Sequence, residues 1–182
     1  MIYEIVKYAN PVLRQRARVV EQFDNELRQL ARDMVDTMHE ADGIGLAAQQ
    51  IGKTLSICVV DIPEKGDSDE EGNRLHPDVE MPLVLINPRV ADSSEETSSY
   101  EEGCLSFPDI TGPVIRPDDV TVNYQDLDGN EHTISAGFLL GRCMQHEIDH
   151  LNGVLFIDRM SHVKRVALGG KLKRLKKKTA GK

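Results

Sequence analysis

The sequence lacks any apolar run long enough to cross a membrane. Although 40% of its 182 residues are hydrophobic, no stretch approaches the ~20 consecutive apolar residues that a spanning helix needs. The first residues also lack the basic-then-apolar pattern of a secretory signal. Three cysteines are too few for a disulfide framework. We therefore expect a single domain in the reducing cytoplasm, with no membrane contact.

Basic residues are concentrated at one end of the chain. The formal net charge is −8, yet residues 164–182 contain nine Lys and Arg residues and no Asp or Glu. The part before residue 164 is therefore strongly acidic. This asymmetry predicts a folded domain over residues 1–163 followed by a basic tail over residues 164–182.

Two segments show helical periodicity. In residues 24–42 the apolar side chains recur every three to four positions, Asp24 is a suitable N-cap, and Gly43 is expected to end the helix. Residues 138–152 predict a second helix, apolar through Phe138 and onward, which Gly153 should stop.

The remaining elements are expected to be strands. Strand-like segments occur at residues 55–62 and 83–86, before Cys104, and in both arms of residues 120–134. The pair Asp128-Gly129 is a hairpin turn signal. Residues 63–81 carry seven acids without periodicity and predict a solvated loop. The stretch GIGLAAQQ is expected to connect the first helix to the next strand. Strands followed by a central apolar helix favour an α+β fold.

The second predicted helix carries the stretch QHEIDH, residues 145–150. His146 and His150 are four positions apart, so they face the same side of the helix one turn apart. In the pattern HExxH, two imidazoles hold a metal and the glutamate, here Glu147, handles a proton. A motif of five residues also occurs by chance on a polar helix face. A tetrahedral catalytic site needs a third protein ligand, and its position separates the candidate classes of enzyme.

The two common metallopeptidase arrangements do not supply that ligand. Phe156 stands where HExxHxxGxxH would place a third histidine, and no glutamate follows Glu147. The third ligand therefore comes from upstream, or it is a less usual donor such as Asp158.

Two cysteines upstream compete for this role. Cys143 shares the helical face of the histidines, but at ~1.5 Å rise per residue it lies roughly 10 Å from His150 along the axis. That distance is too long for both side chains to reach one ion, so Cys143 is expected to pack near the site. Cys104 is free of this constraint, and its neighbour Gly103 permits close approach of the backbone. We predict Cys104, His146 and His150 as the metal ligands.

Three stretches, in this order, resemble the signature motifs of the peptide deformylase family: GIGLAAQQ (43–50), EGCLS (102–106) and HEIDH (146–150). The N-terminal IVKYANPVLRQRARVV also resembles the start of these enzymes, so the resemblance extends from residue 2 to about residue 160. It implies antiparallel β-sheets packed around the metal-bearing helix. It also implies a catalytic domain that removes the N-formyl group from the formyl-methionine of newly made polypeptides and releases formate.

The predicted ligands leave one position of the ion for water. The ion lowers the pKa of that water, and Glu147 is placed to accept its proton and to pass it to a leaving amine. A Cys-His-His set suits Zn²⁺, and Fe²⁺, Co²⁺ and Ni²⁺ are chemically acceptable as well. The family resemblance favours Fe²⁺.

The resemblance implies further catalytic residues. The side-chain amide of Gln50 and the backbone N–H of Leu105 would both donate to the carbonyl oxygen under attack. Glu102 and Arg116 would pair behind the ligands, although an ion pair on the surface is equally consistent with the sequence.

A pocket for an unbranched apolar side chain is also implied. Gly45 lets a bound extended chain approach the backbone, and Ile44, Leu139 and Cys143 are candidates for the pocket lining. Packing in the core is an equally good hypothesis for Leu139. Arg142 interrupts this apolar stretch, so it either shapes the pocket rim or faces solvent.

Two other classes of protein remain as alternatives. A metallopeptidase retains HExxH but lacks the downstream ligand. A nucleic-acid-binding protein with a structural metal site would explain the basic tail, but it predicts a fourth ligand that the sequence does not offer. Formate release from a formylated peptide would separate these alternatives from a deformylase.

The tail contains an apolar stripe, because Leu168, Leu172 and Leu175 fall at i, i+4 and i+7. Gly169-Gly170 weakens the start of such a helix, so the tail is expected to order on a partner. One hypothesis is a contact with ribosomal RNA, close to nascent chains. The other is a solvated tail that lies against the acidic domain.

Overall fold

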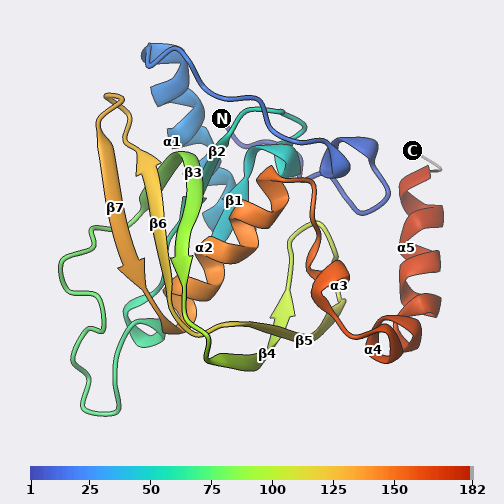
Figure 1. Ribbon diagram of the computed structural model, residues 1–182. Helices are drawn as coiled ribbons and strands as arrows, with labels where there is room; N and C mark the ends of the chain where they lie inside the picture. Colours follow the sequence, from blue (N-terminus) through green and yellow to red (C-terminus); the bar gives the residue numbers. More distant parts are fainter. Residues whose placement is uncertain (181–182) are drawn as a thin grey trace.

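The computed structural model describes residues 1–180, and its central feature is helix α2, which runs between a five-stranded sheet and a two-stranded one (Figure 1). The larger sheet has the order β1-β2-β3-β6-β7, β4 pairs with β5, and all pairings are antiparallel. The predicted α+β fold, with antiparallel sheets around the helix that carries the histidines, is confirmed. No helix in the described part of the chain combines the length and the apolar character needed to cross a membrane.

The elements, in chain order, are η1 Pro11–Arg14, α1 Asn25–Glu40, β1 Gly45–Ala47, η2 Ala48–Ile51, β2 Ile57–Val60, η3 Glu64–Gly66, β3 Leu83–Ser93, β4 Thr97–Gly103, β5 Thr111–Pro117, β6 Val120–Gln125, β7 Glu131–Ala136, α2 Phe138–Leu151, α3 Phe156–Arg159, α4 His162–Ala167 and α5 Gly169–Ala180.

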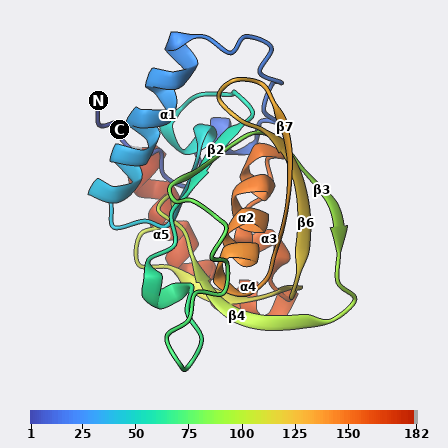
Figure 2. The ribbon, with the colours of Figure 1, turned by 90° about the vertical axis from the view of Figure 1, so that its left-hand side faces the viewer.

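Strand β2, predicted within residues 55–62, is buried on both faces. Ile57 and Val59 pack in the cluster shared with α1, whereas Cys58 and Val60 pack in the cluster shared with α2. Figure 2 shows α1 and α2 on opposite sides of this strand. The strand is a continuous apolar run because alternate side chains enter two different cores.

Helix α1 begins as predicted. The Asp24 side chain accepts a hydrogen bond of 2.9 Å from the Leu27 N–H, and the apolar stripe is buried. The helix ends at Glu40, earlier than the Gly43 we expected, because Asp42 adopts a left-handed φ of 54° and terminates the last turn.

We predicted that GIGLAAQQ only connects the first helix to the next strand. That prediction is wrong, because the stretch contains strand β1 and the short helix η2. β1 is one of the two edge strands of the large sheet, and its three residues are too few to show periodicity. Strand β3 is longer than predicted, and β5 was not predicted. Pro113 and Pro117 obscure the β5 pattern, and they are tolerated because β5 pairs on one side only.

The hairpin predicted over residues 120–134 is confirmed as β6 and β7. Asp126 Oδ1 accepts hydrogen bonds from the N–H groups of Asp128, at 2.8 Å, and Asn130, at 2.9 Å. Gly129 has a φ of 83°, which explains the glycine at this turn.

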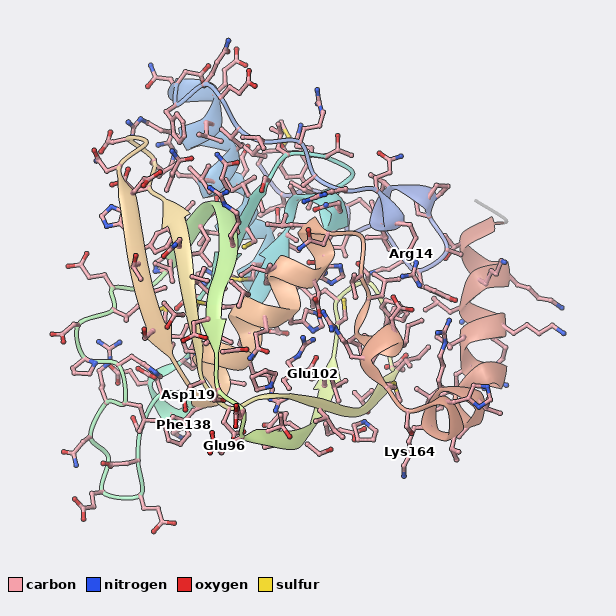
Figure 3. All side chains as sticks on the ribbon, in the orientation of Figure 1. Arg14, Glu96, Glu102, Asp119, Phe138 and Lys164 are labelled. Atoms are coloured by element: carbon pink, nitrogen blue, oxygen red, sulfur yellow. The ribbon has the colours of Figure 1, made fainter. Side chains whose placement is uncertain are left out.

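Helix α2 matches its predicted span, and Gly153, with a φ of 74°, follows its end as expected. The prediction of an apolar start is wrong in one respect. Phe138 is 69% exposed and lies at the edge of the molecule (Figure 3). Every residue of α2 from 140 to 151 is buried, and Leu140, Met144, Ile148 and Leu151 form the apolar face that packs in the core.

Residues 63–81 are more ordered than a purely solvated loop. Asp67 is only 2% exposed, and its carboxylate lies 2.5 Å from His76 Nδ1 and 3.5 Å from the Arg74 guanidinium. The composition of this segment did not indicate a buried acid, since its ion-pair partners lie seven and nine positions further along the loop.

The basic tail folds back on the rest of the chain. Leu172 and Leu175 are buried in a cluster that includes Phe107 and Phe156, with Leu168 packed against it. The expectation that the tail needs a partner to become ordered is therefore wrong for residues 164–180. Residues 181–182 lie outside the described part of the chain.

Candidate active site and metal centre

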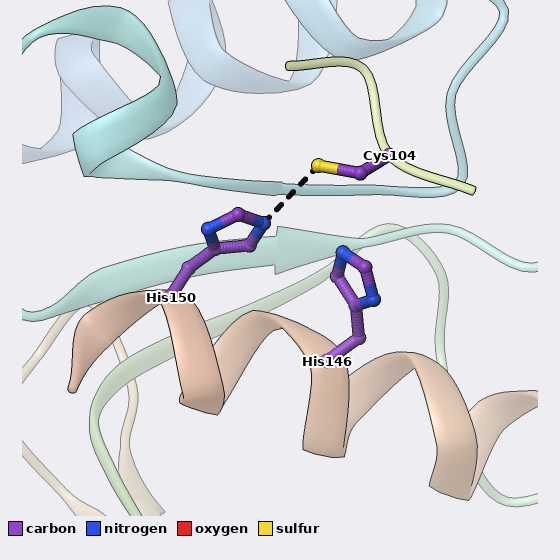
Figure 4. Close-up of side chains that lie close together, drawn as sticks. All are labelled: Cys104, His146 and His150. Carbon is purple, nitrogen blue, oxygen red and sulfur yellow. Dashed lines mark hydrogen bonds between the residues drawn. The ribbon is translucent and has the colours of Figure 1, made fainter. Parts of the chain in front are cut away.

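Three possible metal-ligand atoms converge on one point. His146 and His150 project from α2 with ring centroids 5.0 Å apart, and Cys104 follows directly after β4. Cys104 Sγ lies 3.3 Å from His150 Nε2, and the three ligand atoms are all within 4.8 Å of one another (Figure 4). A tetrahedral ion with ligand bonds of ~2.0–2.3 Å separates its ligand atoms by a similar distance. The geometry fits one divalent cation.

The electrostatics of the histidines also fit a cation site. Burial opposes the charge of His146, but hydrogen bonds to Cys104 and Glu102 raise its pKa well above the usual value. Burial and the neighbouring charge of His146 lower the pKa of His150. The charge on His146 thus disfavours a charge on His150, and a cation bound between the two rings would remove this competition for a proton.

The other ligands considered from the sequence lie elsewhere. Cys143 Sγ donates to the Ile44 carbonyl oxygen at 3.4 Å and is not part of the cluster. Asp158 pairs with Arg14 and accepts a hydrogen bond of 2.9 Å from the Leu155 N–H. The reach argument against Cys143 agrees with this placement.

Glu147 lies beside the cluster in an unusual environment. It is 3% exposed, and its Oε2 has no hydrogen-bonding partner among residues 1–180. Burial raises the pKa of Glu147 to about 7. A Cβ on Gly45 would collide with the Glu147 carboxylate and the Cys143 sulfur, so only glycine lets β1 come this close.

The side chain of Gln50 is held in one orientation. Its Oε1 accepts a hydrogen bond of 2.8 Å from the Ala47 N–H, which turns the Nε2 amide toward Cys104 Sγ at 3.4 Å and Ser106 Oγ at 3.5 Å. The backbone N–H of Leu105 makes no hydrogen bond to another residue in the described range. The Gln50 amide is therefore directed at the sulfur of the cluster, and the Leu105 N–H, next to Cys104 in the chain, has no acceptor among the described residues.

A cavity of about 640 Å³ opens at this point. Its lining includes all four predicted substrate-binding residues: Gly45, Ile44, Leu139 and Cys143. Gln50, Leu105, Cys104, His146 and Glu147 also line it. His150 is 1% exposed and lies behind them.

A buried network of charges supports the histidines from behind. Glu102 lies in the interior beside α2 (Figure 3) and accepts hydrogen bonds of 2.6 and 2.9 Å from Arg116. It also contacts His146 Nδ1 and Arg142, both at 3.0 Å. Burial opposes ionisation of Glu102, but the hydrogen bonds from His146 and Arg116 hold its pKa well below the usual value. The alternative of a surface pair is therefore wrong.

Asp149, a member of this network, was missed from the sequence, whereas Arg142 was named there as shaping the pocket rim or facing solvent. Asp149 accepts from Arg116 at 2.8 Å and from Arg159 at 2.6 Å. An acid within an apolar helix was a usable signal, because a buried carboxylate needs partners. Arg142 contacts the Ser98 carbonyl oxygen at 3.0 Å and lines the cavity, so it is not a solvent-facing residue.

The α+β fold, the metal-fitting cluster and the adjacent carboxylate define the class of metal-dependent hydrolases. Comparison with known proteins identifies the family within this class. The family model for polypeptide deformylases matches residues 2–166, and the chain belongs to this family.

Individual relatives support this assignment. The chain is 49% identical to a peptide deformylase of Opitutus terrae over 185 residues, covering 98% of this chain and 95% of the relative. It is 46% identical to one of Brucella suis, covering 95% and 93%. The crystal structure of a peptide deformylase from Ehrlichia chaffeensis has a TM-score of 0.84 at 39% identity, covering 98% and 97%.

Proposed function

We propose that Cys104, His146 and His150 hold one divalent cation, and that Glu147 transfers the protons of the reaction. The reaction is that of the family, the removal of the N-formyl group from the formyl-methionine of newly made polypeptides. The observation that carries this proposal is the cavity in which the three ligand atoms meet beside a buried carboxylate with an unpaired oxygen.

A divalent cation bound there supplies a Lewis acid that makes hydroxide available near neutral pH. Glu147 accepts the proton of the attacking water and passes it to the amine nitrogen as the formyl C–N bond breaks. Formate and a free N-terminal amine are the products. Gln50 Nε2 and the Leu105 N–H donate to the formyl oxygen while it gains negative charge, and each such donor is typically worth ~10²–10³ in rate.

The methionine side chain is proposed to bind against Ile44, Leu139 and Cys143, which form an apolar part of the cavity. Gly45 allows the peptide backbone to lie close to β1, where any larger residue would collide with Glu147. Binding at this depth places the formyl group beside the three candidate ligands and the general base.

For the ion itself we propose Fe²⁺ in the cell, in the cytoplasm where polypeptides are made. The Cys-His-His set also accepts Zn²⁺, Ni²⁺ or Co²⁺. The ferrous form would be the more sensitive to oxidation, because peroxide oxidises Fe²⁺ beside the thiolate ligand, whereas Zn²⁺ has no redox chemistry.

Formate release tests the function and the metal together. The protein, loaded without oxygen with either Fe²⁺ or Zn²⁺, should release formate from a formyl-methionyl tripeptide and leave the peptide bonds of an unformylated peptide intact. Peroxide should inactivate the Fe²⁺ form faster than the Zn²⁺ form. Internal cleavage without formate release would indicate a metallopeptidase. Equal peroxide sensitivity of both forms would contradict the proposed thiolate-bound iron.

We further propose that the exposed face of α5 contacts ribosomal RNA. The leucines of α5 pack inward and its lysines are exposed. The helix lies at the outer edge of the molecule (Figure 1). A row of cations on a docked helix is a rigid surface for phosphate groups, and binding should weaken steeply with salt.

Charge neutralisation is a better test than truncation, because removing residues 164–182 would also expose the cluster that Leu172 and Leu175 complete. Changing Lys171, Lys173, Lys176, Lys177 and Lys178 to Gln should weaken co-sedimentation with ribosomes at low salt and leave tripeptide turnover near parental. The matched Lys→Arg variant should bind as the parent does. Equal ribosome binding by the Gln and Arg variants would contradict the proposal.

A further inference from the structure

A short N-terminal segment joins the two motifs that carry the proposed oxyanion donors. We call residues 6–8 the N-terminal bridge. The Val6 N–H donates to the Gln50 carbonyl oxygen at 2.8 Å, and the Tyr8 N–H donates to the Ser106 carbonyl oxygen at 2.9 Å. Val6, at one end of the bridge, therefore binds the main chain of GIGLAAQQ, and Tyr8, at the other end, binds the main chain of EGCLS.

Lys7 lies between these two backbone contacts. Its Nζ donates to the Leu105 carbonyl oxygen at 2.9 Å, and the residue lines the same cavity as Glu147 and Gln50. A hydrogen bond from a charged donor is stronger than one between neutral groups. The side chain thus adds a third contact, directed at the residue whose N–H is the second proposed donor.

These contacts are needed because the two donors are distant in the chain. Gln50 lies in η2, whereas Leu105 follows β4, 55 positions further along the chain. The direct links are two long hydrogen bonds from Gln50 Nε2, to Cys104 Sγ at 3.4 Å and to Ser106 Oγ at 3.5 Å. A position error of ~1 Å in a catalytic group costs as much as 10²-fold in rate, so contacts of this length alone hold the two donors only weakly.

We infer that Lys7 is a positioning residue that holds Leu105 so that its N–H stays directed at the formyl oxygen. The inference rests on the proposed roles of Gln50 and Leu105. Lys7 donates to the carbonyl of Leu105, not to the reacting atoms, so its contribution is geometric. The bridge keeps both donors at a constant separation before substrate binds, and no reorganisation is then needed in the transition state.

Two variants of Lys7 separate this role from others. Lys7→Met keeps the apolar stem and removes the donor, whereas Lys7→Arg keeps a cationic donor. With the metal-loaded enzyme and a formyl-methionyl tripeptide, Lys7→Met should lower kcat by about tenfold and leave KM within about twofold. Lys7→Arg should recover most of that loss. Metal content should be parental in both variants.

Lys53→Met is the matched control, because Lys53 also contacts the N-terminal segment, 5.4 Å above the Tyr3 ring, away from the cavity. It should lose some thermal stability and retain kcat. A loss of kcat in both Met variants that follows their thermal midpoints would overturn the inference, since it would indicate a purely structural role. A rise in KM with constant kcat would overturn it too, because Lys7 would then bind substrate directly.

Gln50→Ala distinguishes failure of this inference from failure of the proposed function. If Gln50→Ala lowers kcat and Lys7→Met does not, Lys7 has no positioning role while the oxyanion donors stand. If Gln50→Ala leaves kcat unchanged, the oxyanion role fails and the inference fails with it. A loss of kcat in Gln50→Ala and in Lys7→Met, with recovery in Lys7→Arg, supports the oxyanion donors and the positioning role of Lys7 together.

Discussion

Replacing Glu147 with Gln should abolish nearly all deformylation while the metal stays bound. Glutamine has the same shape as glutamate and leaves Cys104, His146 and His150 unchanged. It cannot accept the proton of the attacking water, and general acid–base catalysis typically contributes ~10²–10⁴ in rate. We therefore expect kcat to fall by ~10²–10⁴-fold.

The variant should fold normally, because the protein groups around Glu147 do not stabilise a negative charge on its side chain. The carboxylate is buried, its Oε2 is unpaired within residues 1–180, and burial already raises its pKa to about 7. A neutral amide is therefore tolerated at this position. Thermal unfolding in the presence of a chelator should show a midpoint for the variant no lower than that of the parent.

Glu101→Gln provides the matched control. Glu101 lines the same cavity, but it is exposed and its carboxylate accepts from Thr111 at 2.8 Å instead of facing the candidate ligands. This control should keep parental turnover. Formate release and metal content should be measured on the same samples. Turnover of the Glu147 variant within about tenfold of the parent would remove Glu147 from the proton-transfer step.

Replacing Cys104 with Ala should lower both the metal content and the stability of the protein. The variant loses the only sulfur close to both histidine nitrogens in the described chain. Since a cation stabilises only the state that binds it, the lost contribution is about 4 kcal/mol at a cation concentration of ~1,000 times Kd. Activity should fall with the metal content.

Cys143→Ala should behave differently, although both cysteines line the cavity. The Cys143 side chain packs with Val60 and Leu140 in the core between α2 and the large sheet. Its removal deletes one buried atom, which costs ~1 kcal/mol. The metal content should stay near parental.

Elemental analysis and thermal unfolding, with and without a chelator, separate these outcomes. A chelator should lower the midpoint of the parent and of Cys143→Ala, and it should have little effect on Cys104→Ala. Loss of metal from the Cys143 variant with retention in the Cys104 variant would reverse the ligand assignment.

The features that were predicted correctly depend on short stretches of chain. The facing pair His146 and His150 follows from the pitch of one helix, and the Asp24 cap and the Asp128-Gly129 turn involve neighbours within a few residues. Cys104 was reached by elimination and by family resemblance, because its contact with His150 spans 46 positions, a separation that helical periodicity does not describe.

The features that were missed depend on distant parts of the chain. Asp149 was not assigned a role, since its partners Arg116 and Arg159 lie on β5 and α3. Glu102 and Arg116 were recognised as a pair, but their burial depends on α2 covering them. The leucine stripe of α5 was recognised too, although the surface that it covers was not.

The sequence by itself determined the family, the helix with its histidine pair, the place of Glu147 beside that pair and the apolar faces, because these follow from local spacing and recognisable motifs. The tertiary structure alone decided how distant groups meet at the site: the distances that join Cys104 to the two histidines, the burial of the charges behind His146, and the hydrogen bond from Lys7 to Leu105. The physical reason is that periodicity specifies which face of an element is apolar or polar, whereas the partner of that face is selected by packing over the whole chain.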